Sequence, residues 1–425
     1  MDGFFKENGA ILWPSGSPYP VLNPWSFHHL TNVVWVDQPV GTGYSQGNVT
    51  AQDEGDIARQ FLGFWKNFID TFEMEGYKVY ITGESYAGMY CPYIAHEMIK
   101  ANDSKYFDVD GMMIYDPSIG SGILTEMSTK YFHDSWKHAI PLNDTAAAAL
   151  EEMADKCNYT TYLDEYLTYP PSKAQPDVDT LPAASDEECD AQNFLINAAL
   201  EINPGFNLYQ ITQLPPVPWD VEGFPYSDFY TYPNTSIYFD RPDVKKALHV
   251  SENVKWEICS TGSVFVGGDS SLPSALHEIP AVIESTNNVQ IHHGVLDFVL
   301  TVNATLLTIQ NMTWNGAMGL SEMPREPLFV PYHENSFVPT SAGAGVLGSW
   351  VEQRGLTVGI VTLTGHMIPE WVPGIAFRQI EVLLRRVENL ASTKPFPQSP
   401  KSPQPKASGL GRGTAGTNWG RVLKT

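Results

Sequence analysis

Basic residues and long apolar runs are both scarce in this chain of 425 residues. It holds 25 lysines and arginines against 48 aspartates and glutamates, which gives a formal net charge of −23. A surface of that sign repels the phosphates of nucleic acids and of anionic lipids, so we expect neither as a partner. No run of about 18 apolar residues occurs, and we therefore expect no membrane span. Charged residues make up only 17% of the chain and aromatics 12%, so its acidity does not indicate disorder.

Cysteine is also rare, and its pattern excludes several kinds of site. The four cysteines are Cys91, Cys157, Cys189 and Cys259, and none forms a CxxC pair. No cluster of cysteines and histidines has the spacing of zinc ligands, so we expect no metal site and no cofactor. Cys157 and Cys189 lie in one proline-rich region and are natural disulfide partners.

A secretion signal is missing from the first residues, although the chain carries marks of the secretory pathway. Residues 1–7 contain neither a basic segment nor an apolar one. Seven N-x-[ST] triplets nevertheless favour passage through that pathway. These candidate glycosylation sites are Asn48, Asn102, Asn143, Asn158, Asn234, Asn303 and Asn311. Either the protein is cytosolic or its true N-terminus is absent from this sequence. The motifs described below favour the second alternative, and with it a secreted or vacuolar protein whose signal precedes Met1.

Short apolar runs alternate with helical patterns and predict an α/β fold. Runs of this kind occur at residues 33–36, 78–82, 111–115, 289–292 and 357–361. Continuous apolar strands belong to a sheet that is covered on both faces. Between the first two runs, apolar residues recur at helical spacing from Ile57 to Phe72, and Thr50 with Asp53 can cap that helix. Strand, helix and strand in this order predict a parallel crossover, hence a mostly parallel sheet with helices on both faces.

Composition divides the chain into three parts. Residues 1–116 and 239–388 carry the strand and helix alternation and form the predicted core. Residues 117–238 hold a helical, alanine-rich piece and several proline-rich segments, which indicates an insertion that caps the sheet. Residues 389–425 are rich in Ser, Pro, Lys and Gly, so we expect a disordered tail.

Residues 83–88, Gly-Glu-Ser-Tyr-Ala-Gly, predict a nucleophile at Ser85. They follow a strand and precede a helix, as a nucleophile elbow requires, and small residues at 83 and 87 let the helix pass close to the strand. An acid and a histidine are then expected after later strands, and Asp297 and His366 occupy those places. His366 would act as general base on Ser85, and Asp297 would hold the imidazole in the required tautomer.

Other histidines carry less weight as functional residues. His292 and His293 lie in or beside a predicted strand, and His28 and His29 lie in a loop. We expect structural roles for these four residues. Since no pair of histidines has a third ligand at metal spacing, they do not indicate a metal centre.

Together these motifs resemble those of the serine carboxypeptidase family, and several are most similar to fungal members. Residues 83–88 match its G-E-S-Y-A-G signature, and residues 365–369 resemble its G-H-M-V-P histidine motif. Residues 23–26 and 37–45 resemble two further blocks, and Asp297 lies in a G-x-x-D-x stretch. The resemblance implies an α/β-hydrolase fold with a helical cap. It also implies removal of the C-terminal residue from peptides with a free C-terminus, through an acyl-enzyme.

The resemblance further implies how the substrate is held. Glu84, just before the nucleophile, would bind the terminal carboxylate of the peptide, with Glu7 as a second carboxyl. Two carboxyls close together cannot both stay ionised cheaply, so one keeps its proton and can donate to the substrate, which favours an acidic optimum. The backbone N–H of Tyr86 would serve the oxyanion hole.

One family block is not found in these 425 residues. Family members carry an N-G-G-P-G-x-S-S block shortly before the region of Glu7, which supplies another oxyanion donor and a cysteine. Because the partner of Cys259 would lie in that block, we expect Cys259 to be unpaired. We also expect Cys91 to be a buried free thiol in the helix after Ser85. Two alternatives stay open: an esterase or acyltransferase that uses the same triad, and an inactive, truncated homologue.

Overall fold

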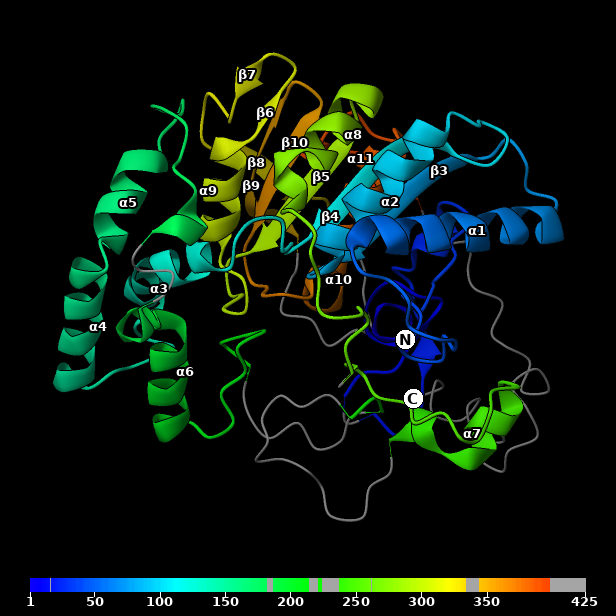
Figure 1. Cartoon of the computed structure of the whole chain (residues 1–425), viewed down its shortest axis with the longest axis horizontal. Helices are drawn as coiled ribbons and strands as arrows, with labels where there is room; N and C mark the ends of the chain where they lie inside the picture. The colour runs from blue at the N-terminus through cyan, green and yellow to red at the C-terminus, as the bar shows by residue number, and fades with distance from the viewer. Residues whose placement is uncertain are drawn as a thin grey trace.

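The computed structural model describes residues 1–15, 17–181, 186–213, 221–223, 237–260, 262–333 and 344–397. At its centre lies a six-stranded sheet in which four parallel strands continue into two antiparallel ones. In spatial order these strands are β3 (Lys78–Glu84), β4 (Asp108–Tyr115), β5 (Val289–Gly294), β10 (Leu356–Val361), β9 (Gly345–Gln353) and β8 (Glu326–Val330). Figure 1 shows helices on both faces, which confirms the predicted α/β class.

Alternate side chains of β4 explain why its sequence is a continuous apolar run. Met112 and Ile114 belong to the apolar cluster on the face covered by α2 (Ala87–Ala101), α8 (Glu278–Thr286) and α9 (Val302–Asn311). Met113 and Tyr115 belong to the cluster on the opposite face, together with α11 (Pro373–Leu383). Because both faces exclude water, both sets of side chains must be apolar.

Four of the five predicted strands are confirmed, and one is wrong. Residues 78–82, 111–115, 289–292 and 357–361 lie within β3, β4, β5 and β10. Residues 33–36 form no strand, because no neighbouring strand among the described residues completes a hydrogen-bond ladder with them. The amphipathic helix is present as α1 (Glu54–Phe72), and the Asp53 side chain caps it by accepting from the Asp56 N–H at 2.7 Å.

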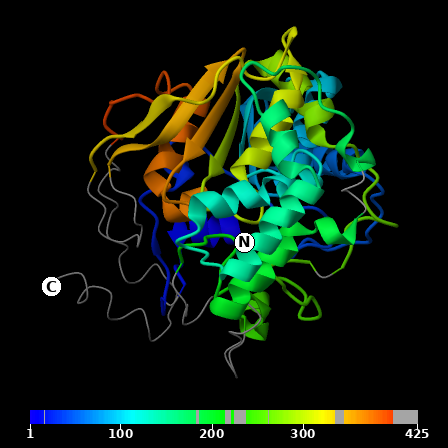
Figure 2. The same cartoon turned by 90° about the vertical axis from the view of Figure 1, so that its left-hand side faces the viewer.

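Four helices from the predicted insertion pack together at one end of the sheet. They lie at the left of Figure 1 and face the viewer in Figure 2, and they share an apolar cluster that also includes Ala304 and Leu307 of α9. Their bounds are α3 (Ile123–Trp136), α4 (Asp144–Lys156), α5 (Tyr159–Tyr166) and α6 (Ala191–Ile202). The limits of the insertion, residues 117 and 238, stay a prediction.

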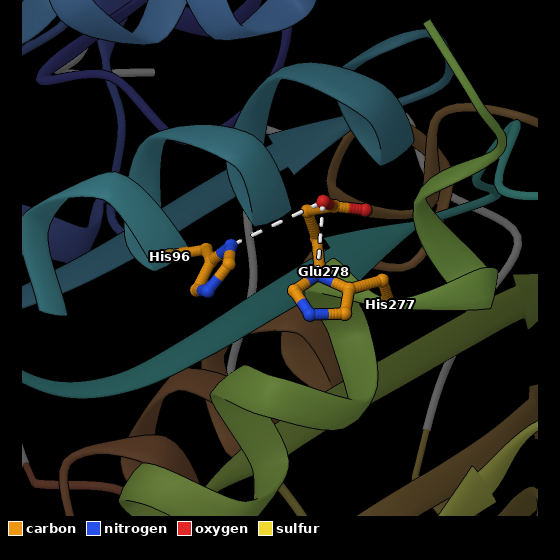
Figure 3. Close-up of side chains that lie close together, drawn as sticks. All are labelled: His96, His277 and Glu278. Atoms are coloured by element: carbon orange, nitrogen blue, oxygen red, sulfur yellow. Dashed lines mark hydrogen bonds and ion pairs between the residues drawn. The ribbon is translucent and has the colours of Figure 1, made fainter. Parts of the chain in front are cut away.

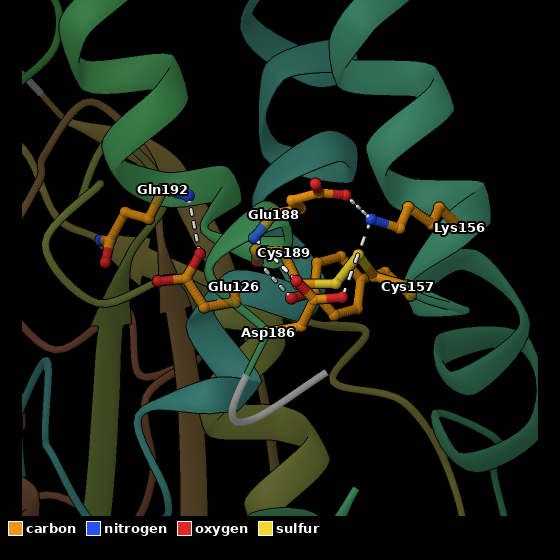
Figure 4. The surroundings of a disulfide bond; sticks show 8 residues. Glu126, Lys156, Cys157, Asp186, Glu188, Cys189 and Gln192 are labelled. Atoms are coloured by element: carbon orange, nitrogen blue, oxygen red, sulfur yellow. Dashed lines mark hydrogen bonds and ion pairs between the residues drawn. A yellow bond between two sulfur atoms is a disulfide. The ribbon is translucent and has the colours of Figure 1, made fainter. Parts of the chain in front are cut away.

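A disulfide joins two parts of this helical group. Cys157, at the end of α4, is bonded to Cys189, just before α6, and their Cα atoms are 5.9 Å apart. Figure 4 shows Lys156 beside this bond, paired with Asp186 and Glu188. The predicted pairing is therefore confirmed.

The remaining elements are short. The helices are η1 (Gly3–Glu7), η2 (Phe27–His29), η3 (Val178–Thr180), η5 (Glu187–Cys189), η6 (Tyr238–Asp240), α7 (Pro242–Ala247), η7 (Ser274–Leu276) and α10 (Ile368–Trp371). The strands pair as β1 (Ile11–Leu12) with β2 (Val21–Leu22), and β6 (Thr313–Trp314) with β7 (Ala317–Met318). None of the helices in the described ranges is long and apolar enough to cross a bilayer.

The predicted start of the tail at residue 389 needs a correction. Leu390 is fully buried, and the ring of Phe396 packs edge-on against Trp25 and Phe377, with centroids 5.1 and 5.7 Å away. The burial of Leu390 and the ring contacts of Phe396 outweigh the polar composition around them. The packed chain therefore extends at least to Phe396, and residues 398–425 lie outside the described residues.

Most candidate glycosylation sites within the described residues are open to solvent. The side chains of Asn48, Asn102, Asn143 and Asn158 are exposed, whereas Asn303 and Asn311 are half-buried in α9. Asn234 lies outside the described residues. Their use as glycosylation sites stays a prediction.

A buried carboxyl at the start of α1 predicts how stability depends on pH. Glu54 is fully buried, and burial together with the charge of Asp269 raises its pKa to about 8. The folded protein then keeps a proton that the unfolded chain releases above its ordinary pKa of 4.5. Stability contributed by this group is complete below pH 4.5 and is lost as the pH rises to about 8.

We expect Glu54→Gln to flatten that dependence. Between pH 5 and 8 the free energy of unfolding should fall more steeply with pH in the wild type than in Glu54→Gln. The two slopes should differ by up to about 1.4 kcal/mol per pH unit. Urea denaturation at several pH values measures this difference. Glu252→Gln, at an exposed position, should leave the slope unchanged. An unchanged slope in Glu54→Gln would contradict the prediction.

Candidate active site

Ser85 lies at the sharp turn between β3 and α2. Its φ angle is +62°, a left-handed conformation that is rare outside glycine. Three hydrogen bonds hold this backbone: Ser85 N donates to the Tyr115 carbonyl at 3.0 Å, and Gly88 N and Ser118 N each donate to the Ser85 carbonyl at 2.9 Å. Strain of this kind, fixed by its surroundings, is typical of functional positions.

Close packing of α2 against β3 explains the small residues of the motif. A Cβ atom on Gly83 would lie 2.5 Å from the Ala87 Cβ and 2.6 Å from the Cys91 Sγ. A Cβ atom on Gly88 would lie 2.5 Å from the Ser118 carbonyl oxygen. Cys91 is buried and unpaired, as predicted, and burial raises the pKa of its thiol to about 12, which makes it unreactive.

Asp297 and His366 meet beyond the ends of β5 and β10. The Asp297 Oδ2 lies 2.7 Å from the His366 Nδ1, and the Asp297 Oδ1 accepts from the N–H of Val299 at 2.8 Å. Burial alone would raise the pKa of Asp297, but the charge and hydrogen bonds of His366 and His293 outweigh burial and hold it below its usual value. The carboxylate is therefore ionised and orients the imidazole.

Tyr209, a residue that sequence reasoning missed, fixes the position of His366. The His366 N–H donates to the Tyr209 carbonyl at 2.8 Å, and the two rings meet edge to face with centroids 5.3 Å apart. Gly365 leaves room for this contact, since a Cβ there would lie 2.0 Å from the Tyr209 oxygen. Tyr209 belongs to the predicted insertion, and no motif marks it. Within the described residues no hydrogen bond joins Ser85 to His366, and such bonds often form only with substrate present.

Glu84 and Glu7 are brought together, as predicted. Carboxyl oxygens of Asp2, Glu7 and Glu84 lie within 4.8 Å of one another. Burial first, and then the neighbouring charges of Asp2 and Glu370, raise the pKa of Glu7 well above its usual value. Burial and the charge of Glu7 do the same for the pKa of Glu84. One Glu84 oxygen is buried without a hydrogen-bond partner among the described residues.

The segment at residues 23–26 supports the cluster formed by the carboxyls of Asp2, Glu7 and Glu84. Asn23 is buried, and its Nδ2 donates to the Glu7 carbonyl at 2.8 Å. The Ser26 hydroxyl donates to the Asn8 carbonyl, also at 2.8 Å. The sequence marked this block as a family motif, and the structure shows that it holds the turn that carries Glu7.

Asp116, at the end of β4, is a second residue that sequence reasoning missed. It is fully buried, and its Oδ1 accepts from the Gly294 N–H at 2.7 Å. The His293 Nε2 lies 3.5 Å from both the Asp116 Oδ1 and the Asp297 Oδ2. Burial and the charge of Asp297 raise the pKa of Asp116 well above its usual value, so the group is protonated. Its position directly after a parallel strand was the available signal, because carboxyl ends of parallel strands meet at one edge.

His292 and Cys259 differ in their exposure to solvent. His292 is buried within β5 beside Gln290, and burial lowers its pKa to about 3, so the ring stays neutral. Cys259 is unpaired, as predicted, and its side chain is exposed.

Comparisons with known proteins point to one family. The family model described as serine carboxypeptidase matches residues 1–386. A probable serine carboxypeptidase of Arthroderma benhamiae is 46% identical over 403 residues, covering 92% of this chain and 75% of that protein. Serine-type carboxypeptidase F of Aspergillus niger is 40% identical over 412 residues, covering 92% and 76%. Among solved structures, a prohormone-processing carboxypeptidase of Saccharomyces cerevisiae has a TM-score of 0.66 at 21% identity, covering 92% and 82%, which supports the fold.

Proposed function

The chain belongs to the serine carboxypeptidase family, and we propose that it releases C-terminal amino acids from peptides through an acyl-enzyme. The proposal rests on three features, which are carried by residues that follow β3, β5 and β10 and by Glu7 of η1. These features are the strained Ser85, the Asp297–His366 pair and the Glu84–Glu7 carboxyls.

In the proposed mechanism, His366 accepts the proton of the Ser85 hydroxyl as its oxygen attacks the last peptide carbonyl. Asp297 stabilises the imidazolium that forms. The backbone N–H of Tyr86, at the N-terminus of α2, donates to the developing oxyanion. His366 then protonates the leaving amino group, and a water molecule, activated by the same histidine, hydrolyses the acyl-enzyme.

In the proposed mechanism, Glu84 and Glu7 recognise the C-terminal carboxylate of the peptide. A protonated Glu84 can donate a hydrogen bond to the substrate carboxylate, and its buried oxygen without a partner supports this role. Glu7 assists through its proximity. In this proposal residues 117–238 form a cap that shapes the pocket for the substrate side chain. The contact of Tyr209, from this region, with His366 supports that role.

One experiment separates this activity from ester hydrolysis. Three substrates with the same N-blocked residues are compared at pH 5: a free acid, its C-terminal amide and its ethyl ester. We expect cleavage of the free acid to exceed that of the amide by at least tenfold, because only the free acid offers a carboxylate to Glu84. Preference for the ester with no cleavage of the acid would favour an esterase, and no cleavage of any substrate would favour an inactive homologue.

Glu84→Gln tests the carboxyl mechanism directly. As the pH rises, ionisation of the coupled carboxyls removes the donated hydrogen bond and repels the substrate carboxylate, so wild-type kcat/KM should fall. A glutamine stays neutral and donates at every pH. We therefore expect the ratio of kcat/KM at pH 8 to that at pH 5 to increase about tenfold in the variant.

The C-terminal amide substrate serves as the control for this measurement. It carries no carboxylate, so its slower cleavage should show the same pH profile in wild type and variant. If Glu84→Gln leaves the profile of the free acid unchanged as well, Glu84 does not recognise the peptide terminus.

We also propose a secreted or vacuolar location. The Cys157–Cys189 disulfide supports it, because such bonds persist in oxidising compartments. Four exposed N-x-[ST] asparagines give further support.

A further inference from the structure

We infer that His96, His277 and Glu278 form a binding site for a divalent transition-metal ion, with zinc as the best chemical match. His96 lies on α2, and His277 and Glu278 lie at the start of α8. Figure 3 shows the three side chains converging between the two helices. The site is separate from the triad, and nothing in the proposed peptidase reaction requires it.

The donor atoms have the separations that one ion demands. The His277 Nδ1 lies 3.2 Å from the Glu278 Oε1, and the His96 Nδ1 lies 4.0 Å from the same oxygen. All three donors lie within 4.8 Å of one another. Zinc binds nitrogen and oxygen at about 2.0–2.2 Å in a tetrahedron, which places ligand atoms roughly 3.4 Å apart. Small side-chain rotations therefore suffice to close the site.

The burial of the three side chains suits metal binding. The side chains of His96 and Glu278 are 17% and 12% exposed, whereas His277 is 67% exposed, so the site is framed by packed helices and open on one side. Two imidazoles and one carboxylate leave a fourth position for water.

Two other groups of potential ligands serve the active site instead. The group of Asp116, His293 and Asp297 is fully buried, and the His293 Nε2 is already 2.8 Å from the Leu300 carbonyl. In the second group, the carboxyls of Glu7 and Glu84 hold protons, because burial raises the pKa of each. Among the described residues, the His96 group is thus the one of these three groups that has solvent access and two imidazole ligands.

Binding should strengthen the contact between α2 and α8. Helix α2 begins directly after the elbow at Ser85, and Ala95 on α2 packs in the same apolar cluster as Ile279 on α8. An ion held by both helices would therefore stabilise the folded chain. Sequence spacing could not reveal the site, because its histidines lie far apart in the chain and meet only through this packing.

The test uses the full chain in a Cys259→Ser background, which removes an exposed thiol that could itself bind zinc. After treatment with a chelator and dialysis, the protein is titrated with ZnCl₂ at pH 7.5, by calorimetry and by thermal unfolding. We expect one saturable site and a Tm that rises with zinc concentration, with no rise for Mg²⁺, which prefers oxygen ligands.

Two variants and one control decide the outcome. His96→Ala and Glu278→Gln should each weaken zinc binding at least tenfold, whereas His138→Ala, at an exposed histidine elsewhere, should bind as the parent does. Circular dichroism confirms that the variants are folded, and His96→Gln replaces His96→Ala if it is not. Absence of zinc binding in the parent, or equal binding in the variants, would overturn the inference.

Discussion

Ser85→Ala is expected to lower kcat for a blocked dipeptide by about 10⁶-fold while KM changes little. Loss of the nucleophile removes the acyl-enzyme route, and substitutions of this kind in serine hydrolases have effects of that size. The neighbouring Glu84 and Glu7 remain in place to bind the substrate. Steady-state kinetics at pH 5 measure the change, and a fluorophosphonate probe, which reacts with an activated serine, should label the wild type alone.

Ser135→Ala is the matched control for this experiment. Its hydroxyl is exposed on α3 and donates only to the Tyr131 carbonyl at 2.9 Å, so its loss should affect neither rate nor labelling. Cleavage of the dipeptide by Ser85→Ala at more than about 1% of the wild-type rate would show that another group is the nucleophile.

Asp297→Asn is expected to lower kcat by about 10⁴-fold. The asparagine keeps the size of the side chain, but its amide can donate to the His366 Nδ1 and so stabilise the wrong tautomer, in which the other ring nitrogen cannot accept the serine proton. Single-turnover kinetics with an ester substrate separate the acylation step from product release. Thermal unfolding shows whether the fold survives the substitution.

Asp116→Asn provides an internal comparison for that prediction. Asp116 is equally buried and contacts the same His293, yet it is protonated, so a neutral amide should replace it well. Its Oδ1 can still accept from Gly294. We expect less than a tenfold change in kcat. Equal losses in the two variants would mean that Asp116 is ionised, or that both effects are structural.

The sequence by itself determined the local elements and the order of the chemical groups. Apolar runs such as residues 111–115 became strands because they are short and are buried on both faces of the sheet. The small residues around Ser85 marked the elbow, because only small side chains fit between β3 and α2. Asp297 and His366 could be placed since carboxyl ends of parallel strands meet at one edge.

Tertiary structure decided whatever depends on contacts between distant segments. Residues 33–36 have the composition of a strand, yet a strand exists only where a neighbour accepts its hydrogen bonds. Protonation of Asp116 and the contact of Tyr209 with His366 arise from burial and packing. The same holds for the histidines of α2 and α8, which stand side by side only because two helices pack on one face of the sheet. The hydrophobic periodicity of the sequence indicates which face of a helix or strand is apolar, but it does not indicate which other element covers that face.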